Sequence, residues 1–376
     1  MPKILAIDTS CDDSSAAVVE GSVVFSNIVA SQNQIHKQYG GVFPTVAKQE
    51  HQKNLDPAIN LAMKQAQVDW SEIDAIAVTV GPGLAPALEV GINKSKELAQ
   101  KYNKKIIAVN HIEAHALSAL AINNGQKNDL SSPKLPSLAV VISGGHSEFI
   151  LVDAIGHYQK IGQTIDDAAG ECLDKVGRLL NLGYPAGSLL EKFAKKGRPD
   201  KFIFPKAMTS QANFDLSFSG LKTAARNLIA NLEKQDKLNK QTIYDLALAM
   251  QTAVFEQIAY KLERILLSPN LEQGLYPNRD FMKHLKKGQA IPTKINEIWL
   301  GGGVAANISL RQVIRKTLNK YKNLSGKKIA LKVPYSKKLC GDNAAMIGLV
   351  ANFKYSRGES TEIDSLDRKP NFAIGE

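Results

Sequence analysis

The chain of 376 residues contains 44% hydrophobic and 22% charged residues, an ordinary composition for a folded protein with room for two domains. Its formal charge of +11 favours a polyanionic partner, and its three scattered cysteines exclude a disulfide framework and fit a reducing compartment. No run approaches the ~18 apolar residues of a membrane span, and the N-terminus has no secretory leader, so we expect a cytoplasmic protein without membrane contact.

Residues 1–125 carry alternating strand and helix signals. The first β-rich run is nearly all apolar, as a buried strand should be, and a linker rich in Asn, Ser, Pro and Lys follows the segment. The predicted elements are strands at 4–8, 15–20 and 23–30, a helix from about Thr45 to Gln67, a strand at 75–80, a helix from about Ala87 to Tyr102, a strand at 105–110, a further helix, and the linker at 123–137.

The same order of elements begins again after the linker. Strands are predicted at 137–145, 147–154 and 157–165, then helices, a strand at 298–303, a helix at 309–321, a strand at 329–334 and a helix at 343–355. Two such units indicate an α/β protein of two related lobes with a cleft between them, the architecture of the actin, Hsp70 and sugar kinase (ASKHA) superfamily. We expect lobes at 1–125 and 136–352, a surface insertion at about 267–294, and a loosely held polar tail at 353–376.

Three strand ends carry polar or glycine-rich turns that such a fold places at one cleft. They are Asp8 to Asp13, Ser143 to Ser147 and Gly301 to Asn307. Glycines there let backbone N–H groups approach an anion closely, and a helix start favours an anion nearby. Tight turns also need glycine for purely structural reasons, but three in register across two lobes indicate a nucleotide site.

His111 and His115 are four residues apart, so in a helix both imidazoles can reach one metal ion. The alternative is one hydrogen-bonded core histidine and one solvated histidine. A zinc peptidase of the H-E-x-x-H type needs its glutamate directly after the first histidine, and that position here is Ile112. Glu113 lies about 200° around the helix from His111. The peptidase interpretation therefore lacks its base.

Six segments together resemble a known family. HIEAH, SGGHSE, DDAAGECLDK, SFSGLKTA, GGGVAAN and CGDNAAM are similar, in this order, to motifs of the universal tRNA adenosine threonylcarbamoyltransferase family, formerly labelled a glycoprotein endopeptidase, and the resemblance runs from Ile4 to about Ala351. It implies transfer of a threonylcarbamoyl group from threonylcarbamoyl-adenylate to N6 of adenosine 37 in tRNAs that read codons beginning with adenine, with release of AMP.

The resemblance also implies site residues. His111, His115 and Asp342 match the family's metal ligands; Ile142, Ser143, Gly144, Gly145 and His146 would lie along the acyl-adenylate; Asp174 and Gly187 would hold its adenosine; and Asn307 would lie beside the nucleobase or ribose. Two imidazoles and a carboxylate suit iron(2+) or zinc, which would activate the acyl donor as a Lewis acid. No nucleophilic side chain is needed, so we interpret Cys172 as packed, and the base for N6 is left open.

The partners implied by the resemblance are tRNA, threonylcarbamoyl-AMP, a small paralogue with the first-lobe fold that would form a heterodimer, and a separate ATPase. The helix after GPGLAPALEVG is the expected dimer face. Basic residues that could guide tRNA gather in three clusters, at 94–105, at 192–201 and at 311–328, and a solvated helix face is the simpler interpretation of each cluster alone.

The chain departs from the family pattern at three places, one of which is the additional insertion at about 267–294. Asp8 and Asp13 replace the usual glutamates of the first turn, each with a side chain one methylene shorter, and residues 44–49 read PTVAKQ where the family has Pro-Glu-Leu-Ala-Ser-Arg. Two rival functions are a noncatalytic scaffold of the same fold and an ATP-dependent kinase or ATPase of the same superfamily. Retention of both histidines and Asp342 argues against the scaffold.

Overall fold

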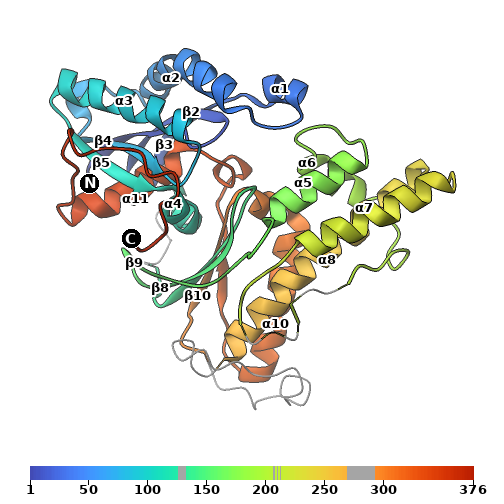
Figure 1. Cartoon of the computed structure of the whole chain (residues 1–376). Coiled ribbons are helices and arrows are strands. Elements are labelled where there is room, and N and C mark those ends of the chain that lie inside the picture. The colour runs from blue at the N-terminus through green and yellow to red at the C-terminus, as the bar shows by residue number, and fades with distance from the viewer. Residues whose placement is uncertain (126–132, 206–207, 210, 212, 269–292) are drawn as a thin grey trace.

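The computed structural model describes residues 1–125, 133–205, 208–209, 211, 213–268 and 293–376, and it contains two sheets (Figure 1). The first sheet has the strand order β5-β4-β1-β2-β3-β6 and the second has the order β11-β10-β7-β8-β9. The strands are β1 (Lys3–Asp8), β2 (Asp13–Glu20), β3 (Val23–Ser31), β4 (Ala75–Gly81), β5 (Lys105–Asn110), β6 (Ile122–Asn123), β7 (Ser137–Ile142), β8 (Ser147–Ala154), β9 (His157–Gln163), β10 (Glu297–Gly301) and β11 (Ala330–Lys332).

The two sheets repeat one pairing pattern. In the first, β1 pairs antiparallel with β2 and parallel with β4; in the second, β7 pairs antiparallel with β8 and parallel with β10. The orders β3-β2-β1-β4-β5 and β9-β8-β7-β10-β11 therefore correspond strand by strand. This repetition confirms the predicted two-lobe α/β fold of the ASKHA type.

Helices cover both sheets. They are α1 (Asn33–His36), α2 (Pro44–Ala66), α3 (Ala85–Tyr102), α4 (His111–Leu117), α5 (Ala169–Leu179), α6 (Gly187–Ala194), α7 (Ser219–Lys234), α8 (Lys240–Leu267), α10 (Ile308–Ser325) and α11 (Ala344–Ser356). The predicted long helices of the first lobe correspond to α2 and α3. Helix α2 begins at Pro44, whose fixed φ and missing N–H suit the first position of a helix, and it ends where Gln67 adopts a left-handed conformation.

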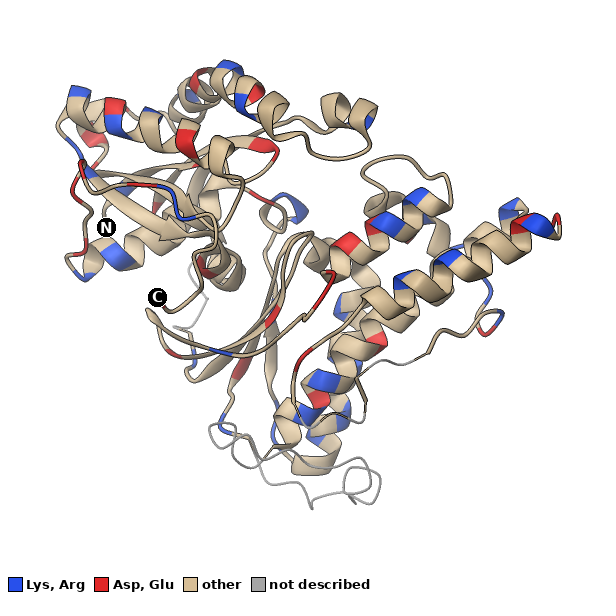
Figure 2. Cartoon of the chain, viewed as in Figure 1, with Lys and Arg blue, Asp and Glu red and all other residues tan. Residues whose placement is uncertain are grey.

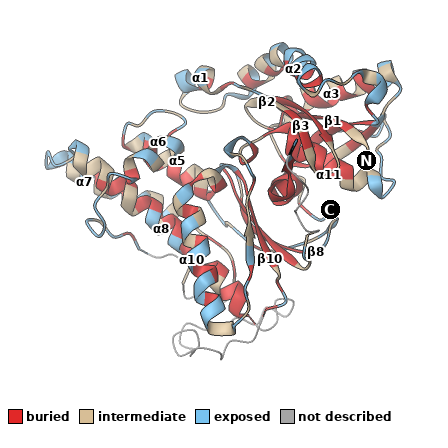
Figure 3. Ribbon diagram, turned by 180° about the vertical axis from the view of Figure 1, so that it is seen from behind, coloured by how far each residue is buried: buried red, intermediate tan, exposed pale blue. Residues whose placement is uncertain are grey.

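Helices α4 and α11 lie between the two sheets and pack against each other. Their apolar side chains share one buried core with residues of both sheets, and Figure 3 shows α11 as largely buried. Helix α4 packs against β7 and β10 of the second sheet, whereas α11 packs against β1 and β2 of the first. Helix α11, which the predicted boundary at residue 352 assigns to the second lobe, thus contributes to the core of the first lobe.

The C-terminal tail is bound along the first lobe, which differs from the loose attachment expected from its polar composition. Its backbone N–H groups at Thr361 and Lys369 donate to the carbonyls of Ile106 and Val80, and the carbonyl of Pro370 accepts from Gly83. Polar composition does not reveal these main-chain bonds, and the side chain of Leu366, buried in the core of the first lobe, adds to the attachment.

The insertion predicted at 267–294 and the linker predicted at 123–137 fall largely on residues 269–292 and 126–132, which lie outside the described part of the chain. Among the described residues, no helix combines the length and apolar composition that crossing a lipid bilayer requires.

Candidate functional site

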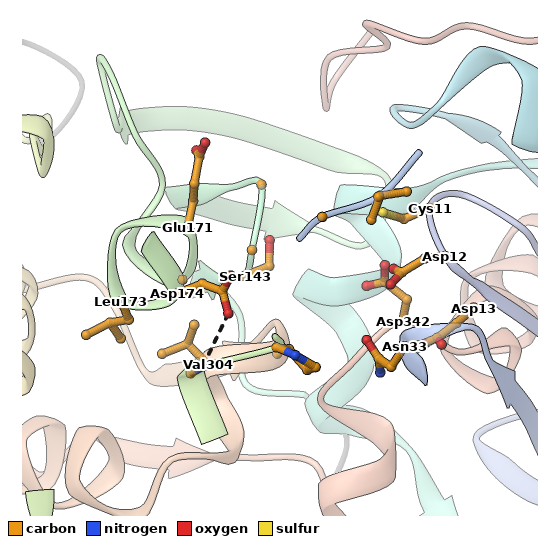
Figure 4. Close-up of a pocket in the computed structure, with 18 of the residues that line it drawn as sticks. Cys11, Asp12, Asp13, Asn33, Ser143, Glu171, Leu173, Asp174, Val304 and Asp342 are labelled. Atoms are coloured by element: carbon orange, nitrogen blue, oxygen red, sulfur yellow. Dashed lines mark hydrogen bonds between the residues drawn. The ribbon is translucent and has the colours of Figure 1, made fainter. Parts of the chain in front are cut away.

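A cleft of about 780 Å³ lies between the lobes, and the turns that follow β1, β7 and β10 all line it. Figure 4 shows that the two walls come from different lobes. One wall carries Cys11, Asp12 and Asp13 together with Asp342, and the opposite wall carries Glu171, Leu173 and Asp174. A ligand in the cleft would therefore contact both lobes.

Three side chains converge beside this cleft: His111 and Asp342 line it, whereas His115 is fully buried and does not. The Nε2 atoms of His111 and His115 lie 3.4 Å and 3.1 Å from Oδ1 of Asp342, and the potential ligand atoms of the three residues all lie within 4.8 Å of one another. The Nδ1 atom of each ring is buried and has no hydrogen-bond partner among the described residues. Two imidazoles and one carboxylate are a donor set that fits iron or zinc.

Local capping positions these three residues. Asn110 accepts hydrogen bonds from the backbone of Ile112 and Glu113, so α4 begins at His111. Asn343 caps α11 by accepting from the backbone of Met346, which places Asp342 directly before this cap. Gly301 allows the close approach of β10 to α4, because a Cβ there would lie 2.0 Å from the carbonyl oxygen of His115.

The electrostatics of the cluster favour a protonated His111 paired with an ionised Asp342 when no cation is bound. Burial would lower the pKa of His111, but the attraction of Asp342 outweighs burial and raises the pKa to about 9. Burial lowers the pKa of His115, and burial together with the other two histidines lowers the pKa of His146 to about 4. Burial would raise the pKa of Asp342, but the attraction of His111 holds it well below its usual range. A metal ion would displace the proton on His111.

Glu113 points away from the two histidines, as helical geometry predicts. Its Oε1 accepts a hydrogen bond of 2.9 Å from the hydroxyl of Tyr158, and its Oε2 lies 3.9 Å from Nζ of Lys354. Glu113 is buried and does not line the cleft. It is therefore not placed to activate a water molecule beside His111 and His115.

The turn after β7 lines the cleft through Ser143, Gly144, Gly145 and His146. The Oγ of Ser143 accepts from the backbone N–H of His146 at 3.0 Å and closes the turn. A Cβ added at either glycine would meet no atom within 4 Å. Ile142, which begins the segment predicted to lie along the acyl-adenylate, does not line the cleft, and its side chain packs in the core of the second lobe.

Asp174 and Gly187 face the cleft and bind each other. Oδ1 of Asp174 accepts hydrogen bonds from the backbone N–H groups of Ala186 (2.5 Å) and Gly187 (3.3 Å), which are at the start of α6. Oδ2 lies 3.9 Å from Nε of Arg178. The carboxylate thus uses one oxygen to hold α6, while the other has only the distant contact with Arg178.

Asn307 lines the cleft, but its side chain is already engaged within the protein. Its Oδ1 accepts from the backbone of Ser309 and Leu310 and caps α10, while its Nδ2 donates to Gln251 at 2.8 Å. The neighbouring Gly303 has open space at its Cβ position and lines the cleft.

The acidic residues from the last position of β1 to the first position of β2 divide between core and cleft. Asp8 is fully buried, and its Oδ2 lies 3.8 Å from Nδ1 of His111. Asp12 and Asp13 line the cleft, and burial raises the pKa of both carboxyls, that of Asp13 to about 7. The cleft also includes residues 40–42 and Arg178, which no sequence motif singled out. The adjacent glycines at 40 and 41 were the available signal.

The basic cluster at 192–201 is partly neutralised. Arg198 binds Asp245 through Nη2 at 2.6 Å, and Nζ of Lys195 lies 3.8 Å from Oε1 of Glu191. Lys196 lies over the ring of Tyr244 at 5.5 Å. Figure 2 shows basic and acidic residues interspersed along the helices of both lobes. The role of this cluster in tRNA binding stays a prediction.

Comparison with known proteins adds independent support. Residues 23–349 match the family model of tRNA N6-adenosine threonylcarbamoyltransferase. The chain is 38% identical to tRNA N6-adenosine threonylcarbamoyltransferases from Limosilactobacillus reuteri (strain DSM 20016), over 96% of this chain and 94% of that protein, and from Clostridium kluyveri (strain ATCC 8527), over 100% and 98%. The equivalent protein of Nostoc punctiforme is also 38% identical, over 96% and 94%.

Among solved structures, the fold is similar to that of HypF from T. kodakarensis, with a TM-score of 0.50 and 16% identity over 95% of this chain and 48% of that one. At this identity the likeness concerns the fold alone. The family match extends across both lobes and includes the segments that line the cleft except residues 10–13, which precede it. The chain therefore belongs to the tRNA N6-adenosine threonylcarbamoyltransferase family, transferases that modify tRNA.

Proposed function

We propose that this protein transfers the threonylcarbamoyl group of threonylcarbamoyl-AMP to N6 of adenosine 37 in tRNAs that read codons beginning with adenine, and that AMP is released. The observation that carries this proposal is the convergence of His111, His115 and Asp342 at the interlobe cleft, which His111 and Asp342 line. The glycine turns and Asp174 line the same cleft. A candidate cation site next to turns that can contact a nucleotide suits a substrate that carries a phosphate next to its reacting carbonyl.

The adenosine of the donor is proposed to lie against the second-lobe wall. A Cβ added at Gly187 or Gly303 would meet no atom within 4 Å, so a flat base or ribose can approach the backbone there. Oδ2 of Asp174 can accept a hydrogen bond from a ribose hydroxyl, while Oδ1 holds α6. Asn307 would support this wall by capping α10, because its own polar atoms are bonded within the protein.

The reaction needs no covalent enzyme intermediate. The lone pair of N6 attacks the carbamoyl carbon, the bond from that carbon to the phosphate oxygen breaks, and AMP leaves with the bonding electrons while N6 loses a proton. A bound divalent ion, iron(2+) by preference or zinc, would supply Lewis acidity toward the carbonyl or phosphate. His111, His115 and Asp342 would hold that ion, and residues 143–146 would orient the donor.

The proposed ligand set is tested by metal content. We expect Asp342→Ala to lose metal nearly as completely as His115→Ala, whereas Glu113→Ala, altered on the same helix but bonded to Tyr158, keeps it. Elemental analysis of the purified proteins measures the loss, and the yield of modified nucleoside with tRNA and acyl-adenylate measures its effect. Retention of metal by Asp342→Ala together with loss in Glu113→Ala would contradict the proposed ligands.

A second assay separates the transferase from a kinase or ATPase. The protein, with its partner proteins, is given tRNA and either threonylcarbamoyl-AMP or ATP, and the tRNA is digested to nucleosides. We expect modified nucleoside with the acyl-adenylate alone. Turnover of ATP without modified nucleoside would favour the kinase or ATPase.

The proposed partners are a small paralogue with the first-lobe fold and a separate ATPase, acting with this chain in the cytoplasm. A groove of about 310 Å³ between α2 and α3, with Val90 among its lining residues, supports α3 as the dimer face. Substitution Val90→Glu should then abolish co-purification with the paralogue and leave the AMP affinity of this chain unchanged.

A further inference from the structure

Two exposed aromatic side chains stack on each other beside the mouth of the cleft. Tyr39 and Phe43 have ring centroids 5.6 Å apart and an interplanar angle of 21°, and they are 57% and 50% exposed. They flank residues 40–42, which line the cleft on the first-lobe side. In Figure 1 this segment follows α1 and faces α5 and α6 across the opening. Aromatic rings exposed to water beside a cleft are typical of a binding site.

The segment that carries the pair is fixed at its base. His36 is fully buried, its Nε2 lies 3.0 Å from Oε1 of Gln32, and its Nδ1 accepts from the backbone N–H of Phe43 at 3.4 Å. The backbone N–H of Gly41 donates to the carbonyl of His36. These contacts hold both ends of the segment, so the two rings keep their position although their outer faces are exposed.

Positive charge lies next to the aromatic pair. The guanidinium of Arg178, on α5 of the other lobe, donates to the carbonyl of Gly40 at 2.5 Å, and its side chain is 41% exposed. Lys37 is exposed in the same segment, two residues before Tyr39. Aromatic faces flanked by cations are the combination with which proteins bind single-stranded RNA, through stacking on bases and attraction to phosphates.

The substrate of the family supplies a base for these faces. An adenosine whose N6 must reach a cleft has to leave the stack of its neighbours, which exposes a face of the flanking base. We propose that Tyr39 and Phe43 form a platform on which a tRNA base flanking the target adenosine stacks, with Arg178 and Lys37 contacting the adjoining backbone. This inference rests on tRNA as the acceptor, and it adds to the proposed function the place where the anticodon loop is held.

Direct stacking is measured with an anticodon stem–loop RNA that carries 2-aminopurine on one side of the target adenosine, and a second RNA that carries it on the other side. Stacking on an aromatic ring quenches the fluorescence of this base. We expect the wild-type protein to change the fluorescence of at least one RNA, and Tyr39→Ala and Phe43→Ala to remove that change. No protein-dependent change in either RNA would overturn the proposal without reference to any variant.

Affinity for the same RNA, measured by fluorescence anisotropy without acyl donor, gives the second readout. Loss of one stacking contact should weaken binding by roughly 5- to 150-fold. Tyr39→Phe and Phe43→Tyr, which keep the rings, should bind as the wild type does. Ile203→Ala is the matched control, because Ile203 is 85% exposed and does not line the cleft.

Two results decide against the platform. The first is an unchanged RNA affinity in the Tyr39→Ala, Phe43→Ala double variant. The second is unchanged RNA affinity together with lost binding to the paralogue or the ATPase, which would make the aromatic pair a protein contact. AMP affinity serves as the test of an intact cleft and should not change. RNA binding is measured without acyl donor, so the aromatic platform can be contradicted while the transfer reaction is confirmed, or the platform confirmed while the reaction is contradicted. The platform and the proposed reaction are therefore tested separately.

Discussion

Replacing Gly187 by alanine should leave the fold intact while placing a methyl group where the donor's adenosine is proposed to lie. Gly187 is the first residue of α6 and lines the cleft, and a Cβ added there meets no atom within 4 Å. Alanine is the better helix former by up to about 1 kcal/mol in a helix interior. We therefore expect the free energy of unfolding to stay the same or rise slightly.

The same methyl group should weaken nucleotide binding. Adding a methyl to a packed contact costs about 1–3 kcal/mol, which corresponds to a Kd for AMP that is higher by roughly 5- to 150-fold. Stability and affinity should thus change in opposite directions, a result that general damage to the fold does not give.

Urea unfolding measures the stability of the variant, and titration calorimetry measures its affinity for AMP. Gly220→Ala is the matched control, because Gly220 is in the first turn of α7, has equally open space at its Cβ position, and does not line the cleft. It should match Gly187→Ala in stability and the wild type in AMP affinity. Wild-type affinity for AMP in Gly187→Ala would refute the proposed position of the adenosine.

Asp174→Asn keeps an acceptor oxygen for the start of α6, so we expect near-normal stability with weaker AMP binding. Asp174→Ala should weaken AMP binding and also lower the free energy of unfolding by about 1–3 kcal/mol. Equal urea midpoints for the two variants would contradict this expectation. Hydrogen bonds from Arg198 lower the pKa of Asp245 from 3.8 to about 2 in the folded protein, so the ion pair stabilises the fold fully above about pH 4 and loses this effect as the pH falls through 2. Because the Arg198 side chain is 57% exposed, we expect the ion pair to contribute about 1 kcal/mol to the free energy of unfolding. Arg198→Leu should remove this part of the acid dependence of urea unfolding. Asn110→Asp keeps the cap of α4 but replaces the Nδ2 donor that binds the carbonyls of residues 372 and 373 in the C-terminal tail. The tail should then detach more often, so the backbone amide of residue 369 should exchange hydrogen faster. Unchanged exchange would show that the tail is held without the Asn110 donor.

Much of the fold could be predicted because its elements carry strong local signals. Strand β1 is a short apolar run, and α2 and α3 have periodic patterns and clear ends, at Pro44 and Gln67 for α2 and at Asn103 for α3. The repeated order of strands and helices then limits the arrangement to two related lobes. The exchange of α4 and α11 between the sheets could not be predicted, because a mainly apolar helix does not specify which sheet covers it.

The segments that form the candidate site could be predicted from the sequence, whereas the contacts of their side chains could not. The family motifs identify the turns that line the cleft, but a motif does not show how each side chain is used. Ile142 packs in the core, and both polar ends of Asn307 bind within the protein. Residues 40–42 reach the cleft through the path of a loop, and local sequence preferences do not specify that path.

The packing of α11 on β1 and β2 has a consequence for the order of events during synthesis. The first lobe begins at the N-terminus, yet one face of its sheet is covered by residues 344–356 and its edge turns are bound by the tail after them. A nascent chain therefore exposes apolar residues of the first sheet on the ribosome until residues 344–356 have been translated. Contacts of such large sequence separation form slowly, so we expect the unfinished first lobe to be the stage at which chaperones engage this protein.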